Sequence, residues 1–540
     1  MNKAKEQRII NSALWAAAGD AIGWISELTD EHGLKRRTGH NYLHMPLSWE
    51  RKVGGYAGVN VTFPAGTYSD DTQLRLAVSR AITGDGKFDI ESFAKIELTV
   101  WLSYALGAGR ATKAAATNLM KKDNSWFSNF YNIGNSNYIY AGGNGTAMRI
   151  QPHVWSCKNL ENNDYTTSVV KDSLVTHGHL LAVCGAILHA NSIKHALITG
   201  KPATPAEIRV HISELSKIKE IIHSSFELNN FWLPVWEDLN KSTLGVELEK
   251  IQNETHLYLN KCIGVIDDNK NPNESFKKII DTLDCKTDNR RGAATNTALA
   301  SSLLCYIFKD SNPYEAILAT VNELGIDTDS IASMAGAILG CYSEIPKWDI
   351  QDSEYIINEA KRLSNISIGI TEKSFSYPSI NNWVPPQTQS DTLLESPDGN
   401  LFVTGLGRVN PIDNISWNTK NYSWQWMRFD YGQTILLKSK LRDSILTKEN
   451  REQSIINNTL NLFEENTLTP GKTKYIDHTT SPIITEEDLD IDKLTSQLIK
   501  DGFNSERIGH YLIKIADKKG LDLSIAYAAI ICKAFIARKK

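Results

Sequence analysis

Apolar residues recur at helical spacing through most of the first 365 residues. Near the start, Ile9, Ile10, Ala13, Leu14 and Ala17 fall on one face of a helix predicted over residues 5–25. Further helices are predicted after Asp70 and Ala147 and over 90–106, 112–120, 174–196, 292–308, 313–324 and 331–342. Period-two alternation is almost absent here, and 30–68 and 134–146 are interpreted as loops. The pattern predicts an all-α orthogonal helical bundle.

The pattern changes after residue 365. Ser, Thr, Asn and Pro become dense, so residues 366–398 are interpreted as a linker. Strands are predicted at 401–403, 422–426 and 434–437, and helices return over 489–500, 505–518 and 523–538. We therefore predict three parts: a domain over 1–365 with a helical insertion at 204–284, the linker, and a smaller α+β accessory region over 399–540.

Two short acidic clusters each precede a small-residue helix. They are Ser69-Asp70-Asp71 and Asp327-Thr328-Asp329-Ser330. A simple explanation for each is helix capping, because acidic residues favour helix N-termini. Two such clusters with hydroxyl neighbours also suit a hard cation such as Mg2+, if the two helix starts converge. From the residues alone, a metal-assisted hydrolase and a phosphate-binding protein both remain open.

Composition narrows the class of protein. A length of 540 residues exceeds what one core usually organises, so more than one domain is expected. The formal net charge of -4 gives no global electrostatic case for nucleic-acid or membrane binding. Seven cysteines without a C-x-x-C pair indicate reduced thiols, and we expect a cytoplasmic protein. No run of about 18 apolar residues predicts a membrane span.

Several segments, in order, give the sequence a family resemblance over about residues 8–345. They are Gly19-Asp20-Ala21-Ile22-Gly23 with Glu27, Ser69-Asp70-Asp71-Thr72, Gly107-Ala108-Gly109-Arg110-Ala111-Thr112, Gly143-Asn144-Gly145-Thr146-Ala147-Met148-Arg149, Thr176-His177 and Gly325-Ile326-Asp327-Thr328-Asp329-Ser330. With these segments the chain resembles the ADP-ribosylglycohydrolase family, including the dinitrogenase reductase-activating glycohydrolases.

The resemblance implies an all-α fold with a binuclear magnesium centre, in which Mn2+ is an alternative ion. It implies metal ligands at Ser69, Asp70, Asp71, Asp327, Asp329 and Ser330. It implies catalytic carboxylates at Glu27, Asp70 and Asp329. It implies substrate contacts at Gly107, Gly109, Gly143, Asn144, Gly145, Thr146, Met148 and His177.

The implied activity is hydrolysis of the N- or O-glycosidic bond at the anomeric carbon of the distal ribose. ADP-ribose would leave a modified protein or nucleic-acid acceptor, whose identity the sequence does not give. Alternatives are a non-catalytic ADP-ribose-binding module and a hydrolase of a free ADP-ribose derivative. The C-terminal region is expected to bind a partner or mediate oligomerisation, and no membrane is expected.

Several residues also have plain structural interpretations. Asp20 is expected to support the metal ligands rather than be one, Met148 to lie in the core, and Arg149 to pair with a buried acid instead of phosphate. Ile326 stands where the family commonly has glycine and is expected to reshape the rim of the site. The tryptophans at 383, 417, 424 and 426 fit the core of a small domain, or else a stacking surface.

Overall fold

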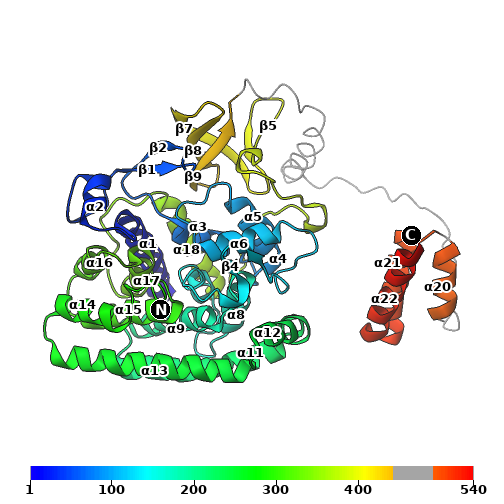
Figure 1. Ribbon diagram of the computed structural model, residues 1–540, viewed down its shortest axis with the longest axis horizontal. Helices are drawn as coiled ribbons and strands as arrows, with labels where there is room; N and C mark the ends of the chain where they lie inside the picture. The colour runs from blue at the N-terminus through cyan, green and yellow to red at the C-terminus, as the bar shows by residue number, and fades with distance from the viewer. Residues whose placement is uncertain (1, 442–490, 501, 539–540) are drawn as a thin grey trace. The chain divides into compact units, whose positions relative to one another are not determined.

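The computed structural model describes residues 2–441, 491–500 and 502–538. The chain divides into two compact units, residues 1–466 and 467–540, and each is described by itself. Helices dominate the larger unit, with a curled sheet at one edge (Figure 1). The predicted all-α bundle with an α+β accessory region is confirmed at this level.

The helices of the larger unit begin and end as follows. They are α1 (Asn2–Ser26), α2 (Glu31–Thr38), α3 (Asp70–Ala81), α4 (Ile90–Ser92), η1 (Phe93–Glu97), α5 (Leu98–Trp101), α6 (Arg110–Leu119), η2 (Tyr138–Tyr140), α7 (Gln151–Trp155), α8 (Thr166–Thr176), α9 (Leu180–Thr199), α10 (Pro205–Ser213), η3 (Glu214–Lys217), α11 (Ile218–Ser224), η4 (Leu228–Trp232), α12 (Leu233–Asn240), α13 (Leu244–Asp268), α14 (Pro272–Thr282), α15 (Ala294–Ile307), α16 (Pro313–Val321), α17 (Thr328–Leu339), α18 (Ser353–Ser367), η5 (Ile380–Asn382) and η6 (Gln389–Asp391).

Helices α1 and α17 pack backbone against backbone. A Cβ atom on Gly19 would lie 2.2 Å from the Ala332 carbonyl oxygen, and one on Gly23 would lie 2.6 Å from the Asp329 Cα. On the other helix, Gly336 and Gly340 approach the backbone of Trp15 and Asn11 in the same way. Any larger side chain at these glycines would separate the helices, so they fix how the end of α1 meets the start of α17.

Three parts of the helical prediction are wrong. The helix predicted over 174–196 breaks at 177–179, because His177 is extended and Gly178 packs against the Tyr138 ring, where a Cβ would lie 2.3 Å from a ring carbon. Residues 30–68 are more than loop, since they hold α2, capped by Asp30, and a hairpin. The helix expected from Ala147 begins at Gln151.

The strands form two hairpins and one meander. The hairpins are β1 (Trp49–Val53) with β2 (Val59–Phe63), and β3 (Asn132–Ile133) with β4 (Ser136–Asn137). The sheet, antiparallel in the order of the chain, comprises β5 (Leu393–Glu395), β6 (Leu401–Val403), β7 (Gly407–Asn418), β8 (Tyr422–Phe429) and β9 (Thr434–Lys440). The predicted strands at 401–403, 422–426 and 434–437 are present, whereas β5 and β7 were not foreseen.

The sheet shares one hydrophobic core with the helices. Val403, Trp424, Trp426 and Leu436 are buried in the same cluster as residues of α1 and α3. The segment predicted as a linker crosses the helices and bonds to them, since Trp383 donates its indole N–H to the Lys95 carbonyl at 2.7 Å. The division between compact units lies at 466/467, not at 366–398. Trp383, Trp424 and Trp426 thus belong to this shared core rather than to the core of a separate small domain, and Trp417 packs against it partly buried.

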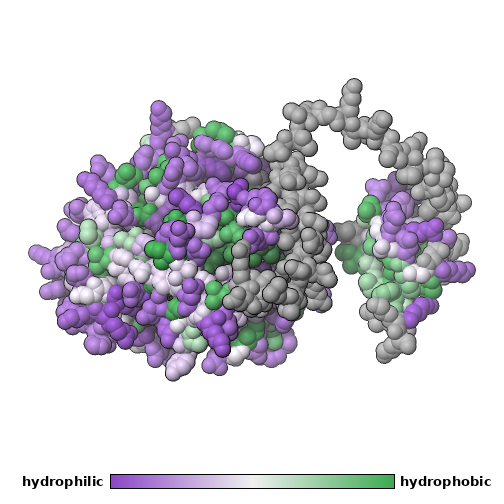
Figure 2. Space-filling view, turned by 90° about the horizontal axis from the view of Figure 1, so that it is seen from above, coloured by the Kyte–Doolittle hydropathy of each residue, from purple (hydrophilic) through white to green (hydrophobic). Residues whose placement is uncertain are grey.

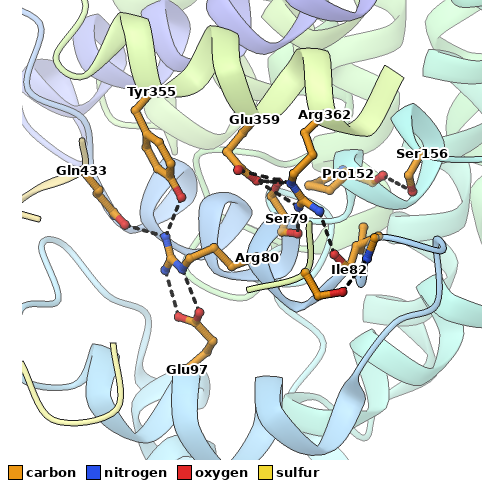
Figure 3. Close-up of polar contacts among 12 residues, drawn as sticks. Ser79, Arg80, Ile82, Glu97, Pro152, Ser156, Tyr355, Glu359, Arg362 and Gln433 are labelled. Atoms are coloured by element: carbon orange, nitrogen blue, oxygen red, sulfur yellow. Dashed lines mark hydrogen bonds and ion pairs between the residues drawn. The ribbon is translucent and has the colours of Figure 1, made fainter. Parts of the chain in front are cut away.

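A buried ion pair joins α3 to the segments after residue 350. Arg80 donates twice to Glu97 at 2.8 Å, and both side chains are almost fully buried. Figure 3 shows the same guanidinium bonded to Gln433, before β9, and to Tyr355 of α18. On the far side of Glu97, Tyr377 donates its hydroxyl at 2.6 Å. Core helix and sheet are thus held in one arrangement by a fully partnered charge.

In the smaller unit, the described residues form three helices. They are α20 (Ile491–Lys500), α21 (Ser505–Lys519) and α22 (Leu521–Arg538). Leu498, Ile515 and Tyr527 belong to its own buried cluster. The helices predicted over 505–518 and 523–538 are present, whereas 489 and 490 lie outside the described residues.

The surface is mostly polar and the cysteines are unpaired. In the view of Figure 2 the larger unit is mostly hydrophilic, with small, separate apolar patches. All seven cysteines are free, and six are buried. Of the described helices, α9 alone is long and apolar enough to span a membrane, but 83% of that stretch is buried inside the protein, as in a core helix.

Candidate active site

The two acidic clusters meet where α3 and α17 begin. Ser69 caps α3, and its hydroxyl accepts from the Asp71 N–H at 3.2 Å. Asp327 stands at the same position on α17 without capping it through its side chain. The Ser330 hydroxyl donates across to the Asp71 carboxylate at 3.4 Å. Two helix starts that are 258 residues apart in sequence thus bring their carboxylates together.

Asp20 of α1 holds the start of α3 in place. Its carboxylate accepts from the Ser69 N–H and the Thr72 N–H, both at 2.9 Å, and from the Thr72 hydroxyl at 2.5 Å. Arg75 donates to the same Thr72 hydroxyl and to Ser333 of α17. Both oxygens of Asp20 are thus used by the backbone, so the structure gives it a supporting position.

Glu27 completes the acidic group from the end of α1. Oxygens of Glu27, Asp327 and Asp329 lie within 4.8 Å of one another. Two backbone bonds hold this end against the second cluster, from Leu28 N–H to Ile326 O at 3.2 Å and from Gly325 N–H to Thr29 O at 3.1 Å. Ile326 itself is fully buried, so its side chain is not at the rim, and that expectation is wrong.

The carboxylates raise one another's pKa values. Burial raises the pKa of Glu27 to about 7, with Asp327 adding to the rise while Arg51 opposes it. Burial likewise raises the pKa of Asp70 to about 7, against a hydrogen bond from Ala108 that lowers it. Burial first, and then neighbouring carboxylates, raise the pKa values of Asp71 and Asp329 well above their usual range. The group is a concentration of carboxylates that nearby arginines such as Arg51 and Arg75 offset only in part.

These residues fit a hard divalent cation. The Asp71 Oδ2 atom is buried and has no hydrogen-bond partner. An orphaned carboxylate oxygen is costly in an apolar interior, and a cation removes that cost. Carboxylate and hydroxyl oxygens are the donors that Mg2+ and Mn2+ prefer. Ser69, Asp70, Asp71, Asp327, Asp329 and Ser330 thus form a chemically suitable donor set.

Two loops support the carboxylates from outside the clusters. The Asn144 amide donates to Asp327 Oδ2 at 3.0 Å, while its backbone N–H donates to the Gly292 carbonyl at 2.8 Å. The Ala108 N–H donates to Asp70 Oδ1 at 2.8 Å. Gly107 has φ +94°, and a Cβ there would lie 2.6 Å from the same oxygen. Only glycine allows this approach.

The remaining predicted contact residues lie beside and beneath the Gly143–Thr146 turn. His177 is buried, and burial lowers its pKa to about 3, so its ring is neutral. Its Nδ1 bonds to the Thr176 hydroxyl at 2.8 Å, and a Cβ on Gly145 would lie 3.1 Å from its Cε1. Thr146 and Met148 are buried, whereas Gly109 is exposed at the start of α6. Substrate contact at these positions stays a prediction.

Arg149 bonds to protein groups. It donates to Asp172 at 2.7 Å, and both side chains are fully buried. His153 bonds to the other oxygen of Asp172 at 2.9 Å. The expected pairing of Arg149 with a buried acid is confirmed.

A cavity of about 470 Å3 adjoins this turn. Gly143, His179, Lys250, Arg290 and Arg291 line it. Gly292, which bonds Asn144 and approaches Asp327, belongs to the same wall. The cations are paired with carboxylates, Lys250 with Glu247, Arg290 with Glu254 and Arg291 with Asp288, so the cavity places a mixed set of charges close to the acidic group.

Sequence reasoning missed several residues that this site uses. Trp24 and Arg51 line a second, smaller cavity that reaches Gly107. Trp24 lies four residues after Asp20 and three before Glu27, so helical spacing alone could have grouped the three. No sequence signal pointed to Arg51 or Gly292, since both depend on how distant segments fold back.

Comparison with known proteins identifies a family for most of the chain. A family model described as ADP-ribosylglycohydrolase matches residues 1–367. One solved structure, titled an ADP-ribosylglycohydrolase-related protein complex, is 16% identical; the match covers 68% of this chain and 99% of that one, with a TM-score of 0.39. A search of curated proteins found no match.

Proposed function

This chain belongs to the ADP-ribosylglycohydrolase family, and from that premise we propose that it removes ADP-ribose from a modified macromolecule. The bond cleaved is the N- or O-glycosidic bond at the anomeric carbon of the distal ribose. Water supplies the hydroxyl that ADP-ribose gains, and the acceptor takes the remaining proton of that water.

One observation carries this proposal: five carboxylates converge without a cation among their side-chain partners. They belong to Glu27, Asp70, Asp71, Asp327 and Asp329. Mutual repulsion makes such a group unfavourable by itself, and two Mg2+ ions would make it favourable. When bound, the ions would supply positive charge to orient a water and the ribose hydroxyls.

The chain's own residues then act on protons and on position. Glu27 has its pKa raised to about 7, which suits a group that accepts a proton from water near neutral pH. Asp70 and Asp329 are the other candidate bases. Asn144 fixes the Asp327 carboxylate, and Ala108 fixes that of Asp70. These bonds hold the donors in one geometry before substrate arrives.

The 470 Å3 cavity beside Gly143 is where we propose that ADP-ribose binds. Its volume falls in the range of ligand pockets. Lys250, Arg290 and Arg291 would attract a diphosphate. Its wall at Gly292 touches Asp327, so a ligand there reaches the acidic group.

A non-catalytic ADP-ribose-binding module is the second candidate function. Loss of a ligand oxygen is what such a module would be expected to show, yet all six predicted ligand residues are present. That favours the enzyme. A hydrolase of a free ADP-ribose derivative uses the same site and differs only in acceptor.

The test measures ADP-ribose released from a panel of ADP-ribosylated proteins and DNA in Mg2+. Wild type should release it, and Asp327→Asn or excess EDTA should abolish release. Asp238→Asn, on the exposed surface of α12, is the matched control and should keep full activity. Full activity of Asp327→Asn would overturn the proposal. Binding of ADP-ribose in calorimetry without release from any substrate would favour the binding module.

A further inference from the structure

A second cavity, of about 180 Å3, lies between the helical core and the sheet. Its walls come from α1, the β1–β2 hairpin, the 103–107 loop and strands β8 and β9. Trp24, Arg51 and Phe63 line one part, and Gly107, Trp424 and Leu436 another. Two of these residues, Trp424 and Leu436, lie beyond the 1–367 family match.

The cavity borders the acidic group through one glycine. A Cβ on Gly107 would lie 2.6 Å from Asp70 Oδ1 and 3.4 Å from the Trp24 indole nitrogen. The wall of the cavity and the carboxylate are therefore neighbours. A group seated here would be next to the reacting bond rather than at the far end of the substrate.

Two donors at this cavity have no acceptor. The Trp24 Nε1 atom is buried without a hydrogen-bond partner, and the whole side chain is 1% exposed. One terminal nitrogen of Arg51 is also buried without a partner. The Arg51 guanidinium lies over the Trp24 ring, 5.3 Å from its centroid. Buried donors left unpaired cost free energy, which an acceptor-bearing ligand would recover.

The walls also select for shape. Phe63 meets the Trp24 ring edge-on at 5.2 Å, and Trp424 lies opposite on β8. The volume is below the range of drug-sized ligand pockets, so it fits one ring system and not a whole ADP-ribose. Flat aromatic and guanidinium surfaces favour a planar group.

We propose that this cavity holds the nucleobase of an ADP-ribosylated nucleic acid, the leaving group of the reaction. A base offers ring and carbonyl acceptors to Trp24 and Arg51 and a flat face to the aromatic walls. An arginine acceptor fits poorly, because its guanidinium only donates and carries the same charge as Arg51. The inference rests on the proposed hydrolysis: the water oxygen bonds to the anomeric carbon, the bond to the base breaks, and the base takes the proton.

The turnover test compares two substrates that share ADP-ribose and differ in acceptor. One is a single-stranded oligonucleotide with ADP-ribose on a base, and the other a peptide with ADP-ribosylated arginine. Wild type should prefer the oligonucleotide by at least tenfold in kcat/KM. Leu436→Phe, which fills the cavity without changing charge, should raise KM for the oligonucleotide about tenfold and leave the peptide unchanged. Arg51→Met removes the unpaired donor and should also raise KM for the oligonucleotide, but the peptide is no control for this variant, because Arg51 also lowers the pKa of Glu27.

A binding test separates failure of the cavity from failure of the proposed function. Thymidine and guanosine are titrated into Asp71→Asn protein, with and without Leu436→Phe. Nucleoside binding that Leu436→Phe abolishes supports the base site, even if no substrate is cleaved. Release from the peptide alone, with no nucleoside binding, overturns the base site and leaves the hydrolase standing. Equal losses on both substrates in Leu436→Phe also overturn it.

Folding is checked separately. Far-UV circular dichroism and the unfolding midpoint of Leu436→Phe should match those of wild type. If Leu436→Phe does not fold, Arg51→Met takes its place in the nucleoside-binding test. Arg51 is only half-buried.

Discussion

The larger unit buries charge in two different ways. At the starts of α3 and α17, five carboxylates gather and leave Asp71 Oδ2 without a partner. Elsewhere, Arg80 with Glu97 and Arg149 with Asp172 each pair a buried carboxylate with a guanidinium. Both ion pairs are almost fully buried, whereas in the acidic group Asp70, Asp71 and Asp329 are buried and Glu27 and Asp327 are half-buried. The difference is whether the protein supplies the opposite charge itself.

That difference separates a binding site from a structural contact. A buried ion pair satisfied by its own chain holds segments together and needs nothing further. A buried acidic group that raises its own pKa values has room for a cation from outside. Four predictions test this contrast.

The largest effect is expected for Asp71→Asn. Turnover should fall by more than about 100-fold, because even the groups behind a metal ligand account for 10- to 100-fold. In excess EDTA, however, the variant should unfold at a higher temperature than wild type, since one repelling charge is gone. Steady-state rates and thermal unfolding in EDTA check the two halves. If the variant is inactive and also less stable than wild type in EDTA, the acidic group stabilises the fold as the buried ion pairs do, and the proposed difference between them is wrong.

Arg80→Met should have the opposite effect on stability. It leaves Glu97 buried without its cation and should cost about 3–5 kcal/mol of unfolding free energy. Urea unfolding measures the change. The double variant Arg80→Met/Glu97→Leu is the control and should recover much of the loss, because neither charge then remains unpaired. If the double variant is as unstable as the single one, the pair is not the cause.

Asn144→Ala tests the support behind the acidic group. It removes the amide that holds Asp327 Oδ2 at 3.0 Å. Activity and affinity for Mg2+ should each fall about 10- to 100-fold, with the fold retained. Calorimetry with Mg2+ and the release assay measure this. If the affinity for Mg2+ is unchanged, Asn144 does not support the metal-binding residues.

The smallest effect concerns pH. Burial alone would raise the pKa of Asp172, but Arg149 and a hydrogen bond from His153 outweigh it and lower that pKa. A lowered folded pKa gives stability that is present above the unfolded value of about 3.9 and lost as pH falls through the folded one. The stability gap between wild type and Asp172→Asn should therefore be full at pH 6 and shrink below about pH 4, by about 1.4 kcal/mol per pKa unit. A gap that stays constant to pH 3 contradicts this.

The sequence predicted the parts of the site that depend on local chemistry. Aspartates that precede an apolar run mark the start of a helix. The sequence therefore predicted that one helix starts at Asp70 and another beside Asp327. It could not predict which loops reach those starts. Arg51 and Gly292 come to the site through a hairpin and a turn, and nothing in their neighbours indicates this.

The fold outside the helices was predicted less well, for a physical reason. Strand β7 is mostly exposed and lacks alternating burial, so it carries no period-two signal. The alternating tryptophans near residue 424 predicted a strand but not where it packs. A buried tryptophan has the same sequence pattern in a separate domain as in a core shared with the helices. The sequence therefore predicted a separate domain, whereas the strands contact the β1–β2 hairpin and the residue that precedes α18.

The glycine contact between α1 and α17 has a consequence for synthesis. Glu27 and Asp327 are 300 positions apart, and a ribosome adds about 5–20 residues per second, so roughly 15–60 s pass between them. During that time α1 has no α17 to pack against, and its small-residue face stays open to solvent or to a chaperone. The acidic group cannot form before the start of α17 has been made and can pack against α1. The group therefore depends on two segments that are synthesised far apart in time.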